Sequence, residues 1–265
     1  MAKVAKRSPK WFGWKPDLPD HRDLRMAPRP TEALPRRSIL PSQFVPPVRN
    51  QGAQGSCTGH GVRSIMQYMR MKEAQKPLEL SPRFAYWNGR AIEGTTSEDS
   101  GAEIRDVIKG VAKYGIACER DCKYNQKVYN KPPSKTAFKE ALTDIAVEYR
   151  RPDQDIGQIR SIIATEQVPI TFGFSVYSNF SDADDDGRFG MPSGSLEGGH
   201  CIDIVGYDDD YSYQGHNGGV LIMNSWGTDW GCSGPTDTRG FVWMLYDYLL
   251  NPDLCDDFWV VTKVT

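Results

Sequence analysis

The chain has 265 residues, of which 39% are hydrophobic and 25% are charged, a composition typical of a folded protein with a sizeable core. Its formal net charge of −2 argues against nucleic acid or an anionic membrane as a partner of the whole chain. No apolar run reaches the roughly 18 residues of a membrane span, and no secretory signal is visible at the start. We therefore expect a soluble protein, while its compartment stays open.

Residues 1–34 are predicted to form an extended arm. Prolines in this segment oppose regular helix or strand, yet Trp11, Phe12 and Trp14 are side chains that normally bury surface. We therefore expect the arm to lie along the globular body. It could cover a cleft as a short propeptide and keep the protein inactive, or it could hold two lobes together from behind.

Helical patterns dominate the first half of the chain after the arm. Four apolar side chains recur at the spacing of one helix face after Cys57: Val62, Ile65, Met66 and Met69. This pattern predicts a helix that begins at Cys57. Ser81 followed by Pro82 predicts the start of a second helix, with a capping side chain and a first-turn proline. Apolar residues between 104 and 111 predict a third helix.

After about residue 165 the pattern changes to short apolar runs that are typical of strands. The expected strands are 168–174, 201–205, 220–223 and 258–261. Helices first and strands later predict an α+β fold. We place one domain at 35–265, with a helical lobe at about 50–150 and a β-rich lobe at about 151–265. The polar segment 208–219 is interpreted as a surface turn.

Cys57 is a candidate nucleophile because the start of a helix carries a partial positive charge that favours a thiolate. Such a thiol needs a base that takes its proton and returns it to the leaving group. Of the four histidines, His21 lies in the arm, His216 in a Gly-rich loop, and His60 one turn further along the same helix. His200 begins a predicted strand, which is a fixed position for a base.

The sequence around these residues resembles the papain family of cysteine peptidases. Three segments carry the likeness, in the order in which the family has them: Asn50–Cys57 (NQGAQGSC), Gly199–Tyr207 (GHCIDIVGY) and Asn224–Gly231 (NSWGTDWG). The likeness covers the chain from about residue 34 to its end. Gln54 stands where relatives usually have a disulfide cysteine, and Thr58 where they have an aromatic residue. These departures are similar to the bacterial branch of the family, of the xylellain type.

The resemblance implies a papain-like two-lobed fold, with a helical left lobe, a β-barrel-like right lobe and an active-site cleft between them. It implies endopeptidase hydrolysis by a Cys57 thiolate paired with a His200 imidazolium, with His200 as acid and base. Asn224 would orient the imidazole, Gln51 would donate to the oxyanion, and Trp226 would shield the His200 to Asn224 hydrogen bond. No cofactor and no metal are implied.

Substrate contacts are predicted at residues scattered over both lobes. Gly101 and Gly199 are expected to border an extended substrate, Gly101 through backbone hydrogen bonds; a helix-start role is the alternative for Gly101. Asp256 or its neighbour Asp257 would approach the base of a specificity pocket. There a carboxylate would favour a basic side chain, while a surface carboxylate is the alternative interpretation.

Two weaker patterns favour ordinary structural roles. Asp182, Asp184 and Asp186 imitate the first half of a calcium-binding loop, but Ser193 stands where such a loop has Glu, so a solvated acidic loop is favoured. Six cysteines are too few for a disulfide scaffold. With Cys57 free, at most two intramolecular disulfides could form, and we expect the other cysteines to be structural or inert.

Two other functions remain compatible with the sequence. One is a non-catalytic binding protein on the same fold. The other is an acyl transferase, in which an amine rather than water resolves the thioester. In either peptidase or transferase form, we expect a monomer that acts on polypeptides, with its own arm as a further partner and with no nucleic-acid or membrane partner.

Overall fold

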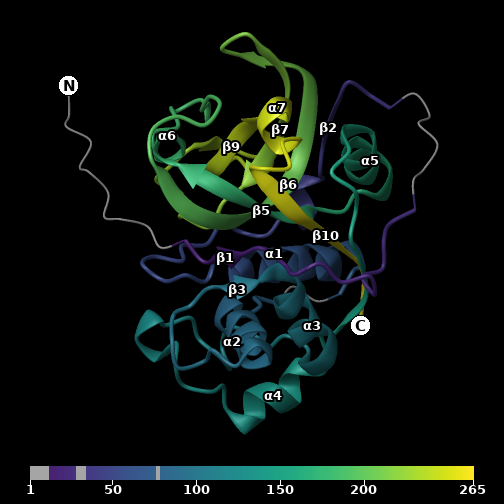
Figure 1. Ribbon diagram of the computed structural model, residues 1–265. Helices are drawn as coiled ribbons and strands as arrows, with labels where there is room; N and C mark the ends of the chain where they lie inside the picture. The colour runs from purple at the N-terminus through teal and green to yellow at the C-terminus, as the bar shows by residue number, and fades with distance from the viewer. Residues whose placement is uncertain (1–11, 28–33, 76–77) are drawn as a thin grey trace.

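The computed structural model of the protein describes residues 12–27, 34–75 and 78–265. The helices are α1 (Cys57–Lys72), α2 (Pro82–Glu93), α3 (Ile104–Tyr114), α4 (Lys135–Ala141), α5 (Ile156–Ser161), α6 (Ser178–Ser181) and α7 (Tyr246–Leu249). The strands are β1 (Trp14–Lys15), β2 (Arg37–Ile39), β3 (Ala102–Glu103), β4 (Ala146–Arg150), β5 (Ile170–Tyr177), β6 (Leu196–Tyr213), β7 (His216–Met223), β8 (Cys232–Ser233), β9 (Arg239–Leu245) and β10 (Cys255–Val264). Figure 1 shows a helical half with α2, α3 and α4 and a half built on a large sheet, with α1 between them.

The sheet half confirms the predicted α+β class but corrects its expected barrel-like form. The strand order is β4-β10-β5-β6-β7-β9-β8, with β2 paired to β6. Neighbouring strands run antiparallel, and His200 on β6 is the register partner of Phe174 on β5. Within the described part of the chain, β4 and β8 end the order without pairing to each other. The sheet is therefore open, because its two edge strands do not pair with each other to close a barrel.

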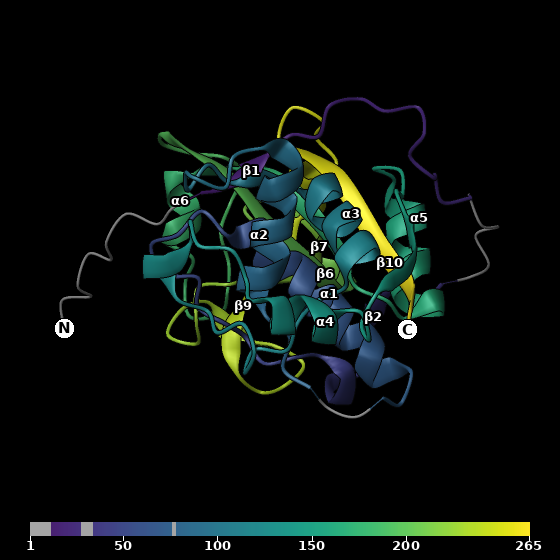
Figure 2. The same cartoon turned by 90° about the horizontal axis from the view of Figure 1, so that it is seen from below.

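Helix α1 is buried along its length from Cys57 to Arg70, because it packs on both halves. Two glycines allow this. An added Cβ at Gly59 would lie 2.6 Å from the backbone of α2, and one at Gly61 would lie 2.8 Å from a side chain of β5. Seen from below, α2 and α3 lie in front of α1 and the sheet lies behind it (Figure 2). The predicted apolar face was thus only part of a helix that is surrounded on all sides.

The predicted helix starts are confirmed. Helix α1 begins at Cys57, and α2 begins at Pro82 with the Ser81 hydroxyl accepting a hydrogen bond from the Phe84 backbone at 3.1 Å. The four predicted strands are present, each longer than its apolar run. Strands β4 and β9 were not predicted, although β9 contains a continuous apolar run from Phe241 to Leu245.

The segment 208–219 is not a loose turn. Strands β6 and β7 continue through it as a hairpin that reverses at Gln214 and Gly215. Tyr211 stacks on Trp243 of β9, with ring centroids 5.1 Å apart and an interplanar angle of 17°. This aromatic pair attaches the hairpin to the sheet, which explains why the polar insertion keeps strand structure.

The described part of the arm runs along the boundary between the two halves (Figure 1). Strand β1 pairs in parallel with β3, with Trp14 opposite Ala102. Further along, Met26 donates to the Arg151 carbonyl at 3.0 Å. The arm is therefore extended and docked, as its prolines and aromatic side chains predicted. Trp11, which belonged to the same prediction, lies outside the described residues.

Candidate active site

Cys57 occupies the first position of α1, where the helix start contributes a partial positive charge. Its side chain is fully buried. Burial raises the pKa of the Cys57 thiol to about 11. Hydrogen bonds from the backbone of Cys201 and Gly13 lower the pKa, but by less than burial raises it. Burial therefore opposes the expected thiolate in this covered arrangement.

His200 lies on β6 and is held by Asn224, which follows β7. The distance from His200 Nε2 to Asn224 Oδ1 is 2.8 Å. A carboxamide oxygen only accepts, so Nε2 carries the hydrogen and Nδ1 is the nitrogen that can take up a proton. The residue after His200, Cys201, contacts the Cys57 sulfur through its backbone. The thiol and the imidazole therefore come from facing elements, α1 and β6.

Aromatic side chains enclose the imidazole. Trp226 stacks on the His200 ring, with centroids 5.1 Å apart and an interplanar angle of 29°. Phe174 and Phe180 contribute further ring contacts at 5.8 and 6.5 Å. His200 is fully buried. An apolar enclosure lowers the local dielectric constant and so strengthens the hydrogen bond between His200 and Asn224.

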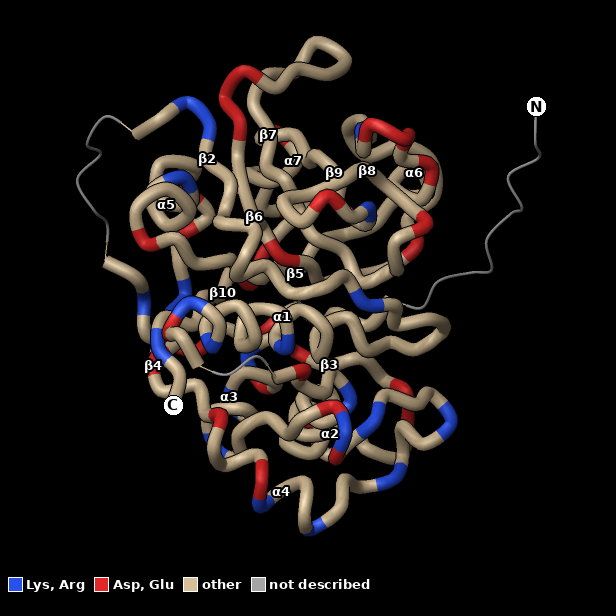
Figure 3. The backbone as a smooth tube through the Cα atoms, turned by 180° about the vertical axis from the view of Figure 1, so that it is seen from behind, with Lys and Arg blue, Asp and Glu red and all other residues tan. Residues whose placement is uncertain are grey.

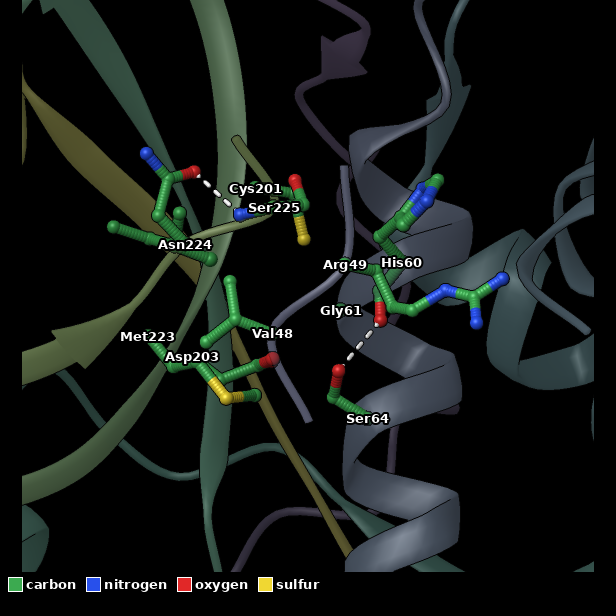
Figure 4. A pocket seen from close by; sticks show the side chains of 11 residues that line it. Val48, Arg49, His60, Gly61, Ser64, Cys201, Asp203, Met223, Asn224 and Ser225 are labelled. Atoms are coloured by element: carbon green, nitrogen blue, oxygen red, sulfur yellow. Dashed lines mark hydrogen bonds between the residues drawn. The ribbon is translucent and has the colours of Figure 1, made fainter. Parts of the chain in front are cut away.

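Gln51 connects the loop before α1 to the loop that holds Asn224. The Ser225 hydroxyl donates to Gln51 Oε1 at 2.6 Å, and the Ser225 backbone donates to Asn224 Oδ1 at 2.7 Å (Figure 4). Gln51 Nε2 donates to the Gln54 carbonyl at 2.8 Å. These bonds fix the Gln51 amide beside the start of α1, where it and the orienting Asn224 share Ser225 as a common support.

His60 on α1 and Asn224 after β7 line opposite sides of a small cavity of about 10 Å³ (Figure 4). This cavity is too small for a peptide side chain. Burial lowers the pKa of His60 to about 3. Its Nδ1 lies 3.0 Å from the Ser56 carbonyl and so carries a hydrogen. His60 is therefore a neutral packing residue, as expected for a histidine one turn along the helix.

Residues 12–14 of the arm cover Cys57 and His200. The Gly13 carbonyl accepts a hydrogen bond from the Ala102 backbone at 2.8 Å. The Phe12 ring meets the His200 ring edge to face, with centroids 6.0 Å apart. A Cβ at Gly13 would lie 1.8 Å from the Gly55 carbonyl oxygen. The arm thus approaches the catalytic helix so closely that only glycine fits at position 13.

Two predicted substrate-contact glycines border the arm, but Gly101 differs from its expected role. Its backbone N–H donates to the Tyr86 hydroxyl at 3.0 Å, and the neighbouring Ala102 is the donor to the arm. Gly101 has a φ of 72°, and a Cβ there would lie 2.2 Å from the Gly13 oxygen. A Cβ at Gly199 would lie 2.5 Å from a backbone oxygen of the arm. Both glycines therefore permit close approach of an extended chain.

Of the two carboxylates expected near a pocket, Asp256 and Asp257, only Asp257 contacts and anchors the arm. Asp257 is fully buried, and its Oδ2 accepts from Trp14 Nε1 at 3.0 Å and from the Asp17 backbone at 2.7 Å. The Asp256 side chain is 56% exposed and pairs with Arg151. Strand β10 shifts register against β5 after Asp256, and Asp257 has a φ of 57°. This bulge turns the two carboxylates to different sides.

Asp17 is the second buried carboxylate of the anchor. It accepts from Trp259 Nε1 at 2.8 Å and lies 3.5 Å from the Arg151 guanidinium. Burial, followed by repulsion from Asp257, raises the pKa of Asp17 from its ordinary 3.8 to about 7. The charged groups that face this pair are Asp23, Arg105, Arg151 and Asp256.

The acidic loop after α6, red in the backbone trace of Figure 3, carries several ion pairs. Asp184 pairs with Arg188 at 2.8 Å, and Asp185 pairs with Arg239 at 2.7 Å. Among the described residues, no group of three metal-ligating side chains is close enough to hold an ion. The carboxylates of Asp184, Asp185 and Asp186 are therefore engaged by arginine side chains.

The remaining cysteines and histidines lie away from catalytic roles. All six cysteines are free and buried. His21 is exposed in the arm, and His216 on the hairpin pairs with Asp247. Within the described ranges, no helix combines the length and apolar character needed to cross a bilayer.

Sequence reasoning missed three residues that the structure brings to the site. Ser225 supports both Gln51 and Asn224, Ala102 donates to the arm, and Asp17 forms the anchor. Ser225 stands inside the NSWG segment and Ala102 directly follows Gly101, so the motifs already pointed near them. No local pattern distinguishes Asp17 from the other acids of the arm.

The sequence and the fold are similar to those of cysteine proteases. The model of the papain family cysteine proteases matches residues 31–241 of the chain. The structure of xylellain, a cysteine protease from Xylella fastidiosa, has a TM-score of 0.83 and 33% identity over 100% of both chains. The uncharacterised peptidase C1-like protein L477 of Acanthamoeba polyphaga mimivirus is 30% identical over 229 residues, 82% of this chain and 70% of that protein. Cathepsin B-like CP2 of Giardia intestinalis is 26% identical over 233 residues, 84% of this chain and 69% of that protein.

Proposed function

The chain belongs to the papain family of cysteine proteases and is a cysteine endopeptidase, and we propose that Cys57 is its nucleophile and His200 its acid and base. One observation carries this assignment. His200 is hydrogen bonded to Asn224 at 2.8 Å on the strand whose next residue, Cys201, contacts the Cys57 sulfur. His60, the other histidine near the thiol, is neutral and faces a carbonyl.

In the proposed reaction the Cys57 thiol gives its proton to His200 Nδ1, and the sulfur attacks the carbonyl carbon of the scissile bond. The tetrahedral intermediate collapses as the carbon–nitrogen bond breaks, and the leaving amine takes the proton from His200. A water molecule then gives a proton to His200 and attacks the thioester carbonyl. Collapse of the second tetrahedral intermediate breaks the carbon–sulfur bond and releases the acid product, and His200 returns its proton to the Cys57 sulfur, which completes the cycle.

Gln51 is proposed to stabilise the oxyanion of both tetrahedral intermediates. The Gln54 carbonyl accepts a hydrogen bond from its amide, and we assign the Gln51 amide and the Cys57 backbone N–H as the donors to the oxyanion. Asn224 keeps the imidazole in the tautomer that the reaction needs, and Trp226 excludes water from their hydrogen bond.

Substrate is proposed to lie where the arm lies. The Ala102 N–H would bond an extended peptide, while Gly101 and Gly199 leave room for its backbone. Both sides of this cleft come from a single chain, so we expect a monomer to be active on polypeptides. Residues 1–34 act in this proposal as a short propeptide, and the peptidase domain follows from residue 35.

The arm is proposed to hold the enzyme inactive through its contacts with Cys57 and Ala102. The Gly13 N–H faces the Cys57 sulfur, while the Gly13 carbonyl is bonded to Ala102. A thiol attacks carbonyl carbon, so the arm presents a backbone donor where a substrate would present its scissile carbonyl. Burial under the arm also raises the pKa of Cys57 and so keeps the thiol protonated.

The test is labelling by an epoxide-type thiol inhibitor, combined with cleavage of an unstructured protein such as reduced casein. Wild-type protein, once its arm has been displaced, should be labelled at Cys57 and should cleave, whereas Cys57→Ala should do neither. Labelling without cleavage would indicate a binding protein. Diversion of the acyl group to an added primary amine, with no hydrolysis, would indicate a transferase.

A further inference from the structure

The loop before α1 is supported from the helical half by Tyr124, which lies in the segment after Cys122. The Tyr124 hydroxyl donates a hydrogen bond to the Gln51 carbonyl at 2.8 Å. The same hydroxyl lies 2.6 Å from Ser56 Oγ. A phenol has a single hydrogen, and here it goes to the Gln51 carbonyl, so the Ser56 hydroxyl donates to the phenol oxygen. One side chain therefore holds both ends of the segment 51–56.

The two ends of this segment carry the proposed oxyanion donors. The Gln51 side chain supplies one donor. The other is the Cys57 N–H, which belongs to the peptide unit that Ser56 forms with Cys57. An oxyanion gains full stabilisation only when both donors lie within hydrogen-bond reach of the same oxygen. The separation of the two donors depends on the shape of segment 51–56, and the Tyr124 hydroxyl bridges the residues at its ends.

The surroundings of Gln51 and Ser56 make this bridge difficult to replace. The Gln51 carbonyl also accepts from Gln126 Nε2 at 2.7 Å, and the Gln51 N–H donates to the Ser225 carbonyl at 2.8 Å. Gln51 and Ser56 are both fully buried. Without the Tyr124 hydroxyl, Gln51 would keep these two bonds, but the buried Ser56 hydroxyl would lose its acceptor. The Ser56 end of the loop would therefore shift relative to the Gln51 end.

Tyr124 is itself held in place by three contacts. Its backbone N–H donates to Glu119 Oε1 at 2.8 Å, and the same oxygen accepts from Arg49 Nη2 at 3.0 Å. Its ring meets the His60 ring edge to face, with centroids 4.8 Å apart. Burial raises the pKa of the Tyr124 hydroxyl, so the phenol keeps its hydrogen and remains a donor. The bridge therefore has a fixed position and a fixed direction of donation.

We propose that Tyr124 is a positioning residue for the oxyanion site, where its hydroxyl sets the separation of the Gln51 amide and the Cys57 N–H. The proposal rests on the proposed function, because it concerns the donors assigned there. Tyr124 acts through Gln51 and Ser56, so loss of its hydroxyl affects the step in which the oxyanion forms and not the binding of the peptide. A displacement of about 1 Å at such a site costs up to about 100-fold in rate.

The experiment compares Tyr124→Phe with Tyr68→Phe in the full chain carrying Gly13→Ala, which lifts the arm. The Tyr68 hydroxyl on α1 donates to the Gln167 carbonyl at 2.9 Å, so this control loses a similar bond away from the loop. Tyr124→Phe should lower kcat for a fluorogenic peptide at least about tenfold and change KM by less than about twofold. Tyr68→Phe should leave both constants unchanged. An unchanged kcat in Tyr124→Phe would refute the proposal.

Two reagents separate the oxyanion site from the nucleophile. A peptide aldehyde forms a carbon–sulfur bond with Cys57, and its carbonyl oxygen, which takes up the thiol proton through His200, occupies the oxyanion position. Iodoacetamide alkylates the same sulfur with loss of iodide and forms no oxyanion. Tyr124→Phe should weaken inhibition by the aldehyde at least about tenfold and leave the iodoacetamide rate unchanged. An equal loss with both reagents would indicate a general distortion of the loop and would overturn the proposal.

The variant Gln51→Ala in the same background distinguishes failure of this proposal from failure of the proposed function. A large loss of kcat in Gln51→Ala with none in Tyr124→Phe would remove the role of Tyr124 and leave the oxyanion assignment in place. Full kcat in both variants would contradict the oxyanion assignment itself.

Discussion

The closest contact between the arm and the catalytic helix region is at Gly13, and it offers a direct test of inhibition. A Cβ at this position would lie 1.8 Å from the Gly55 oxygen and 2.4 Å from the Gly55 carbonyl carbon. Both are backbone atoms just before α1, so neither can rotate away. Gly13→Ala should therefore lift the arm without changing any residue of the peptidase domain.

The size of the effect follows from the geometry. The arm must move by about 1.2 Å to bring the new Cβ to an allowed separation from Gly55. A shift of that size would break the 2.8 Å hydrogen bond from Ala102 to the Gly13 carbonyl, worth about 1 kcal/mol. It would also loosen the contact of Phe12 with His200. The ring contact is worth about 0.5 kcal/mol or more, so the total loss is about 1.4 kcal/mol or more, and we expect an uncovered population at least about tenfold larger.

The assay is the rate of Cys57 alkylation by iodoacetamide in the full chain, read by mass spectrometry of the peptide that contains it. The matched control is Leu18→Ala, since Leu18 lies in the same arm with 72% of its surface exposed. Gly13→Ala should react at least about tenfold faster than wild type, and Leu18→Ala at the wild-type rate. Hydrolysis of a fluorogenic peptide should rise in parallel.

Two results would refute this reasoning. One is a Gly13→Ala protein that unfolds at the wild-type temperature and labels within twofold of the wild-type rate, because the arm would then not limit access. The other is an equal gain in Leu18→Ala, which would indicate a general loosening of the arm and not a contact at Gly55.

Three further predictions concern pH, catalysis and the acidic loop. Docking raises the pKa of Asp17, so the docked arm binds an extra proton between about pH 4 and about pH 7 and should dock less tightly as pH rises through that window. The rate of Cys57 labelling in wild type, divided by the rate in Gly13→Ala, should therefore rise with pH. The variant Asp17→Asn should flatten this rise. Gln51→Ala should lower kcat by about 100-fold to 1000-fold, and Asn224→Ala by about 100-fold, with Cys57 still alkylated once the arm is displaced. Calcium added in a calorimeter should give no binding heat, since Asp184 is paired with arginine.

Each of these has a contradicting outcome. A wild-type to Gly13→Ala ratio that falls with pH would mean that the Asp17 carboxylate is stabilised in the docked state. A Gln51→Ala protein with unchanged kcat would remove this residue from the oxyanion site. Calcium binding that disappears in Asp184→Asn would show that the ion displaces the arginine side chains from the carboxylates of the loop.

Short-range patterns predicted the helices well because each pattern and its structure span the same few residues. The Ser81 cap and the apolar series after Cys57 act within one or two helical turns, and both elements begin where the sequence indicated. Strand β4 was missed because its pattern covers only five residues, and it is held by pairing with β10 more than 100 residues away.

The motifs identified candidate residues for the catalytic roles, but they did not predict which atoms make each hydrogen bond. Gly101 was expected to donate to an extended chain, yet its positive φ aims the N–H at Tyr86 and leaves Ala102 as donor. Either Asp256 or Asp257 was expected near a pocket, and only the bulge in β10 decides that Asp257 is the one that faces inward. A one-residue shift in strand register reverses which side chain faces inward, and no local sequence pattern predicts such a shift.

By itself, then, the sequence determined the chemistry available to this protein: a cysteine at a helix start, a histidine on a strand, and the asparagine and glutamine that would support them. Only the tertiary structure decided that this chemistry is covered. The hydrogen bond from Trp14 to Asp257 joins residues 243 positions apart, and the contact of Gly13 with Gly55 depends on the path of two backbones. Such contacts arise from packing of the whole chain, because burial and close approach are properties of surfaces that meet and not of neighbouring residues.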